Sequence, residues 1–247
     1  MSKKIAHFPF PRKSTQIAPH EIYYDSTKKE DYNYIDYCYK KNTSKSSIAI
    51  ANQFFSIENI LINAFQYVLP VERNANTSSV KFATIIRESC NLFEIISRRL
   101  YIQFFDLSTT EKLDIYNFLS LDFFLNYSST ELKAPILESF HDSGGKIEPY
   151  QSLKNWNRNE PLKPEHIPKW WTAYNKIKHD IDSLGEHATL ENAIYSLSAL
   201  FILIKIVYGD GLICGFLRKK ENASPNTILF QIKKSDIFFG EILKTNR

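Results

Sequence analysis

Glycine is scarce in this sequence, which has 7 glycines among 247 residues, against 18 phenylalanines and 14 tyrosines. A loop that cradles phosphates needs closely spaced glycines, and neither a GxGxxG nor a GxxxxGK pattern occurs. We therefore expect neither a Rossmann-type nor a P-loop nucleotide site. We predict that the protein uses no cofactor.

Cysteine is also scarce and widely spaced. Cys38, Cys90 and Cys214 form no CxxC pair and show no Cys/His spacing. A zinc site or a disulfide framework would need such spacing, so the sequence predicts neither a metal site nor disulfides. Free thiols are typical of a reducing compartment, and we expect a cytoplasmic protein.

Long hydrophobic runs are absent from the sequence. The first residues lack the apolar core of a signal peptide, and the longest apolar stretch, residues 199–208, is interrupted by Lys205. A membrane-spanning helix needs about 20 apolar residues, so we predict no membrane partner. The formal net charge of +4 does not by itself indicate a nucleic-acid partner, but it is compatible with one where basic residues cluster.

The composition is that of a folded body with two extensions. Hydrophobic residues make up 43% and charged residues 23%, which is ordinary for a globular protein. Residues 1–46 form a basic arm with six tyrosines, whose rings could stack on unpaired bases while lysines neutralise phosphates, or could lie against the body. Residues 47–208 form the body. In the tail, residues 209–247, two β-prone runs suggest a hairpin that could pair with the arm.

Helical periodicity dominates the body. Apolar side chains recur at three- and four-residue steps, which is typical of amphipathic helices. Residues 188–208 are apolar nearly all round, so we expect that helix at the centre of a bundle. The sequence thus predicts an all-α fold with a small β hairpin or arm from the termini. The expected elements are helices at 47–67, 79–105, 108–124 (opened by a capping box of Ser108 and Glu111), 168–182 and 188–208, helical turns at 132–138, and a long loop at 141–169 that Trp156 pins.

The helix expected at residues 168–182 carries the candidate chemistry. Pro168 suits its first position, because proline needs no amide partner there. One stripe of the helix is apolar and consists of Trp170, Tyr174, Ile177 and Ile181. A second, polar stripe consists of Trp171, Asn175, Lys178, His179 and Asp182. An imidazole among such neighbours can exchange protons near neutral pH and can hold an anionic group such as a phosphate.

The body resembles HEPN domains over residues 47–208. The resemblance is carried by two long helices, a polar loop, a Trp-Trp-x-Ala-Tyr-Asn-x-x-Lys-His helix and a following apolar helix. The motif is also similar to that of a bacterial sub-group of uncharacterised proteins with a Trp-Trp-x-x-Tyr-Asn-x-x-Lys-His helix. The resemblance implies a bundle of four or five helices, often dimeric, that binds nucleotides or cleaves RNA in toxin–antitoxin, abortive-infection or CRISPR-associated systems.

The HEPN signature is an arginine, a polar residue that is often asparagine, three variable residues and a histidine. Asn175 and His179 match the polar and histidine positions, whereas Tyr174 occupies the arginine position. The resemblance implies that the arginine and the histidine act together on the scissile phosphate without a metal. A nuclease would therefore need the missing charge from elsewhere, and the candidates are Lys178 and, from the helix at 79–105, Arg87, Arg98 and Arg99.

Three functions are compatible with these residues. The first is a HEPN-like RNA-binding or regulatory protein of a defence or toxin–antitoxin type, without the catalytic arginine. The second is a metal-independent endoribonuclease, in which His179 moves protons, Asn175 orients it or holds a phosphate oxygen, and Lys178 stabilises the developing charge. Asp182 would then fix the tautomer of His179. The third is a structural or protein-interaction module in which Asn175, Lys178 and His179 form a hydrogen-bonded cluster.

RNA, a protein partner of unknown kind and a second copy of the chain are the expected partners. The resemblance implies a homodimer, because it places a composite site where two central helices meet. Trp171, expected on the polar stripe, adds support because exposed aromatic side chains often mark interfaces.

Overall fold

The computed structural model describes residues 45–105, 107–110, 112–120, 132–133, 146–157, 160–180 and 182–208. The predicted arm, apart from its last two residues, and the predicted tail with its hairpin lie outside the described residues. The described part is mostly helical, so the predicted all-α class is confirmed for it. No helix in these ranges is both long and apolar enough to cross a bilayer.

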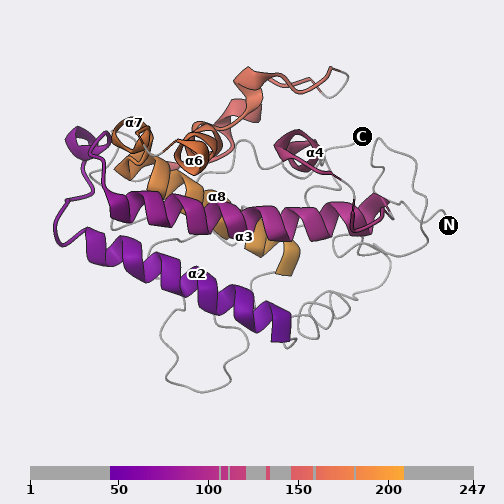
Figure 1. Cartoon of the computed structure of the whole chain (residues 1–247), viewed down its shortest axis with the longest axis horizontal. Helices are drawn as coiled ribbons and strands as arrows, with labels where there is room; N and C mark the ends of the chain where they lie inside the picture. Colours follow the sequence, from indigo (N-terminus) through magenta and orange to yellow (C-terminus); the bar gives the residue numbers. More distant parts are fainter. Residues whose placement is uncertain are drawn as a thin grey trace, which may run out of the picture.

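Two long helices, α2 (Lys45–Ala64) and α3 (Val80–Phe105), run side by side in opposite directions (Figure 1). The buried face of α2 follows the predicted helical period from Ile50 to Ala64. The helix ends at Ala64, three residues before the predicted end, and a chain of turns leads to the short 3-10 helix η1 (Glu72–Asn74). Tyr67, the last residue of the predicted helix, lies beyond the end of α2 and is 78% exposed.

The helix α8 (Leu190–Tyr208) lies at the centre of the described bundle. From Ser196 to Lys205 every side chain is buried, and α8 packs along α3 as well as against α2 and α6. This confirms the prediction made from its nearly continuous apolar surface. Burial on all sides is what such a surface requires, because any exposed face of this helix would leave apolar side chains in water.

The starts of α3 and α8 are tied together by backbone hydrogen bonds. Ser78 and Thr189 form an isolated antiparallel bridge, Ser79 N–H donates to the Ala188 carbonyl at 3.0 Å, and Leu190 N–H donates to the Thr77 carbonyl at 3.0 Å. These bonds satisfy amides at the helix starts that have no partner within their own helices. The two helices therefore begin at one end of the bundle and run in the same direction (Figure 1).

The helix predicted at residues 108–124 is wrong at its start. The helix there is α4 (Ile115–Leu119), and its N-cap is Asp114, which forms a reciprocal capping box with Asn117. Ser108 lies before it, next to the turn at Thr109 and Thr110. Ser108 and Asp114 both fit the local pattern of a capping box. The helix begins after Asp114, where its apolar side chains can be buried in the core.

The helical turns predicted at residues 132–138 are also wrong at their start. Leu132–Lys133 form the strand β1, which pairs in antiparallel register with β2 (Lys146–Ile147). The rest of that prediction lies outside the described residues. Pro135 disfavours helix in the residue before it, and the antiparallel partner offers the backbone hydrogen bonds that a helix would have supplied.

The segment predicted as a long loop, residues 141–169, is a folded cover in its described part. It contains two 3-10 helices, η3 (Gln151–Leu153) and η4 (Pro164–His166), joined by a hydrogen bond from the Ser152 hydroxyl to the His166 carbonyl. Trp156 is buried and donates to the Glu160 carbonyl at 3.0 Å, so the prediction that this residue pins the segment is confirmed.

Tyr150 attaches the cover to the central helix. Its ring is fully buried, and its hydroxyl donates to the Ala199 carbonyl of α8 at 2.7 Å. Burial, and to a lesser extent the charge of Cys90, raises the pKa of Tyr150 well above its usual value. Burial together with the charges of Glu191, Glu148 and Glu72 raises the pKa of Tyr195 on α8 to about 12.

These phenols predict alkaline instability. An unfolded chain releases phenolic protons near pH 10, about the ordinary tyrosine pKa, whereas the folded protein retains them at higher pH. The unfolded state then binds fewer protons than the folded state. The contribution of these phenols to the free energy of unfolding is therefore fully present below about pH 10 and falls as the pH rises toward 12. We expect the urea midpoint at about pH 11 to lie well below that at about pH 8.

Tyr150→Phe tests the origin of this pH dependence. The variant loses a hydrogen bond worth about 1 kcal/mol at every pH, but its own midpoint should change less between the two pH values than that of the parent. Tyr67→Phe is the matched control, because Tyr67 is exposed. It should show the same difference between the urea midpoints at the two pH values as the parent. An undiminished pH difference in Tyr150→Phe would contradict the assignment to this buried phenol.

Candidate functional site

The candidate site lies on α6 (Lys169–His179), which is shorter than predicted at both ends. Pro168 is the N-cap rather than the first helical residue, with φ −59° and ψ 142°, and its carbonyl accepts from Trp171 N–H at 3.0 Å. At the other end the helix stops at His179, because Asp180 adopts an extended conformation. In Figure 1, α6 and α2 lie on opposite sides of α3.

One face of α6 packs on an aromatic cluster. Trp170, Tyr174 and Ile177 are buried, as the predicted apolar stripe requires, and Ile181 lies outside the described residues. Trp170 donates its indole N–H to the Pro149 carbonyl at 2.8 Å, and its ring packs edge-on against Phe93 of α3. This helix is therefore fixed to both α3 and the cover.

Trp171 belongs to the same buried face, so its predicted place on the polar stripe is wrong. It is 5% exposed, with its ring 5.8 Å from that of Phe93 and 5.1 Å from that of Tyr174. On the helix Trp171 lies at the border between the two faces, and packing against α3 draws it inward. The homodimer prediction thus loses the support that an exposed tryptophan would have provided.

Asn175, Lys178 and His179 lie on the exposed face of α6. Within the described residues, no hydrogen bond joins them to one another, and Asn175 and His179 have no other hydrogen-bond or ion-pair partner. The hydrogen-bonded cluster considered for a structural module is therefore not formed. These side chains are free to meet a ligand from solvent.

Asp182 lies beyond the helix and does not support His179. It is exposed, and its backbone N–H donates to the carboxylate of Asp180 at 2.9 Å. The predicted position one turn below the histidine assumed that the helix continues to residue 182. Because it ends at His179, no ion pair between Asp182 and His179 forms in the described structure.

Tyr174, at the position of the family arginine, faces α3. It is 2% exposed, and its hydroxyl donates to Asn91 Oδ1 on α3 at 2.7 Å. Lys178 Nζ lies 5.3 Å from the centre of its ring. Burial raises the pKa of Tyr174, an effect that the Lys178 ammonium partly offsets. A side chain at this position is therefore directed into the interface between α3 and α6, away from Asn175 and His179.

Arg87 is the arginine of α3 that reaches α6. It is half-buried, and its Nη2 donates to the Ile177 carbonyl at 2.9 Å, near the end of α6. Arg98 and Arg99, the other candidates for the missing charge, lie about three turns further along α3; Arg99 lies near Tyr208 of α8, whose pKa it lowers against the larger effect of burial.

Asn91 was not among the predicted site residues. It lies one turn after Arg87 on α3, is exposed, and accepts from Tyr174. The signal that could have found it is its spacing, because residues four apart share one helix face.

Metal binding has no candidate here, since no group of three His, Cys, Asp or Glu residues gathers in the described ranges. Cys90 is buried and carries a free thiol, and burial followed by the charge of Glu94 raises its pKa well above the usual value. Such a thiol is poorly suited to nucleophilic chemistry. No protein-family model matches the chain, and neither a curated protein nor a solved structure matches it.

Proposed function

We propose that this protein is a HEPN-like helical protein that binds RNA without cleaving it, in a regulatory role of the defence or toxin–antitoxin type. The observation that carries the proposal is the division of α6 into two faces. Asn175, Lys178 and His179 are exposed, whereas Tyr174 is buried and bonded to α3. The residues that match the polar and histidine positions of the HEPN signature are thus available to a ligand. The residue at its arginine position is not.

The same division weighs against the alternative of a metal-independent endoribonuclease. Acid–base cleavage of RNA needs a proton-transferring group and a charge that stabilises the phosphorane-like transition state at the same phosphate. His179 is exposed, but no arginine or acidic residue contacts it within the described structure. A lone exposed imidazole can bind a phosphate far more readily than it can cleave one.

RNA binding on this face would be electrostatic and polar. Lys176, Lys178 and His179 are exposed in the last turn of α6, Lys169 is exposed at its start, and Asp180 follows at its end. Lysines neutralise backbone phosphates, and an exposed amide such as that of Asn175 can bond to a base or a ribose. The affinity should therefore fall as the salt concentration rises. A homodimer remains a prediction of the resemblance alone.

His179→Ala should weaken binding of a short single-stranded RNA by about tenfold, the effect of losing one good polar contact. The melting temperature should stay within about 2 °C of the parent, because the side chain is exposed and contacts little. Fluorescence anisotropy in the presence of a chelator measures the affinity, and gel electrophoresis of the same RNA reports cleavage.

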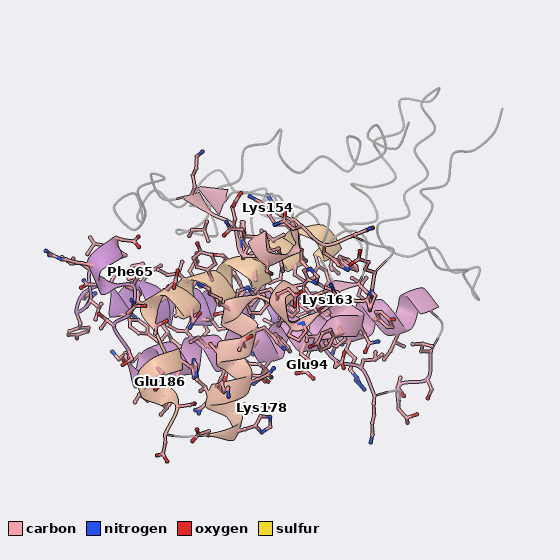
Figure 2. The ribbon with its side chains drawn as sticks, turned by 90° about the horizontal axis from the view of Figure 1, so that it is seen from above. Phe65, Glu94, Lys154, Lys163, Lys178 and Glu186 are labelled. Atoms are coloured by element: carbon pink, nitrogen blue, oxygen red, sulfur yellow. The ribbon has the colours of Figure 1, made fainter. Side chains whose placement is uncertain are left out.

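A pair of lysine variants provides the control. Lys178→Ala should weaken binding as His179→Ala does, whereas Lys154→Ala should not, since Figure 2 shows Lys154 and Lys178 on opposite sides of the bundle. Equal losses from the two lysine variants would indicate unspecific attraction. RNA cleavage by the parent that His179→Ala abolishes would replace the proposed function by the endoribonuclease.

A further inference from the structure

Four side chains join α3 to α6 as two pairs, each spaced by one helical turn. Arg87 and Asn91 belong to α3, and Tyr174 and Lys178 belong to α6. Arg87 donates to the carbonyl of Ile177, the residue before Lys178, at 2.9 Å. Tyr174 donates to Asn91 at 2.7 Å, and Lys178 lies over the ring of Tyr174. We refer to Arg87, Asn91 and Lys178 as the seam donors.

The seam donors carry N–H groups that bind no acceptor within the described part of the protein. Asn91 accepts from Tyr174 through Oδ1, so this bond does not use its amide N–H groups. Arg87 uses one of its five N–H groups on Ile177. Within the described residues, no acceptor binds the remaining N–H groups of Arg87 and Asn91, and Lys178 has no partner besides Tyr174. Asn91 and Lys178 are exposed and Arg87 is half-buried, so a ligand can reach all three.

Neither Arg87 nor Lys178 forms an ion pair with an acidic side chain in the described structure. Glu88 is turned toward α2, where it accepts from Gln53 at 3.3 Å. Glu94, further along α3, affects the pKa of Tyr174 but forms no ion pair with Arg87 or Lys178. Asp180 accepts from the backbone of Asp182. Two cations and an amide with unused N–H groups at one seam suit an oxyanion.

We propose that Arg87, Asn91 and Lys178 bind a phosphate group at the seam between α3 and α6. The group is a backbone phosphate of the bound RNA, so the inference rests on the proposed function. Arg87 and Asn91 extend the RNA-contacting surface from α6 onto α3. Their contacts with Ile177 and Tyr174 hold both side chains in place before the ligand arrives, which lowers the entropy cost of binding.

Asn91→Asp is the sharpest test of the seam. The carboxylate is nearly isosteric and still accepts from Tyr174, so the junction between α3 and α6 is kept. It replaces the outward amide donors by an oxygen that repels a phosphate. Asn52→Asp is the matched control, since Asn52 is exposed on α2 and the change adds the same charge. Thermal melting of both variants verifies that they are folded.

We expect Asn91→Asp to weaken binding of single-stranded RNA by about tenfold or more, and Asn52→Asp by less than about twofold. Arg87→Gln removes the positive charge and should reduce the magnitude of the slope of log affinity against log salt by about 0.7, the value for one phosphate of a single strand. Equal affinities of Asn91→Asp and Asn52→Asp for the RNA would overturn the seam site while leaving the proposed function intact.

Inorganic phosphate separates the two proposals. NMR of the arginine side-chain Nε–H groups in the full chain, titrated with inorganic phosphate at constant ionic strength, should show a saturable shift of the Arg87 signal that Asn91→Asp removes. This shift without any RNA binding would overturn the proposed function and retain a phosphate site that serves a small phosphate compound. No shift and no RNA binding would overturn both.

Discussion

Leu197→Asp should leave little folded protein. Leu197 is fully buried in the middle of α8, which is itself surrounded by α2, α3 and α6. The substitution removes apolar contacts and places a carboxylate where no water reaches it, at a cost of several kcal/mol. Since a domain is typically stable by about 5–15 kcal/mol, this is a large part of the whole. The soluble yield and the far-ultraviolet circular dichroism measure the loss.

The matched control is Leu69→Asp. Leu69 is 58% exposed in the turn after α2, so the same change should leave the yield and the melting temperature close to those of the parent. A Leu197→Asp protein that melts near the parent would show that α8 is peripheral, contrary to the structure.

Trp170→Ala should be the most damaging single change on α6, at about 3–5 kcal/mol. The indole is buried between Phe93 of α3 and Tyr150 of the cover, and its N–H satisfies the Pro149 carbonyl. Its removal leaves a large cavity and an unpaired carbonyl where α6, α3 and the cover meet. We expect a lower urea midpoint and faster proteolysis within residues 146–157, because the cover loses its attachment to α6.

Trp170→Phe separates packing from hydrogen bonding. It retains an aromatic ring but not the indole N–H, so it should cost only about 1–2 kcal/mol and protect residues 146–157 from the protease better than Trp170→Ala does. Two variants of equal stability would mean that the ring does not hold the cover in place.

The features that the sequence predicted well are those set by composition along one helix. The central place of α8 follows from an apolar surface that no exposed helix could carry, and the core face of α3 follows from its period. The buried stripe of α6 is predictable for the same reason at Trp170, Tyr174 and Ile177.

The features that were missed depend on a second element. Trp171 lies at the border of two helix faces, and only the presence of Phe93 decides which face it joins. The place of Asp182 depends on where α6 ends, and Arg87 from another helix binds the carbonyl there. Asn91 has only its four-residue spacing from Arg87 as a local signal, because its relation to Tyr174 exists only once α3 and α6 have packed. The helix that carries the candidate site is thus predictable from a local pattern, whereas the contacts of that helix with α3 are set by tertiary packing.

The bridge between Ser78 and Thr189 has a consequence for how the chain folds during synthesis. Its two residues are about 110 positions apart, so the pairing closes a long loop and raises the average separation of contacts, which slows folding. While the ribosome is still adding the residues before α8, α2 and α3 can pair, but the face of α3 that α8 will cover stays in water. A nascent chain of this length presents phenylalanines and isoleucines of α3 as a binding site for chaperones until α8 emerges.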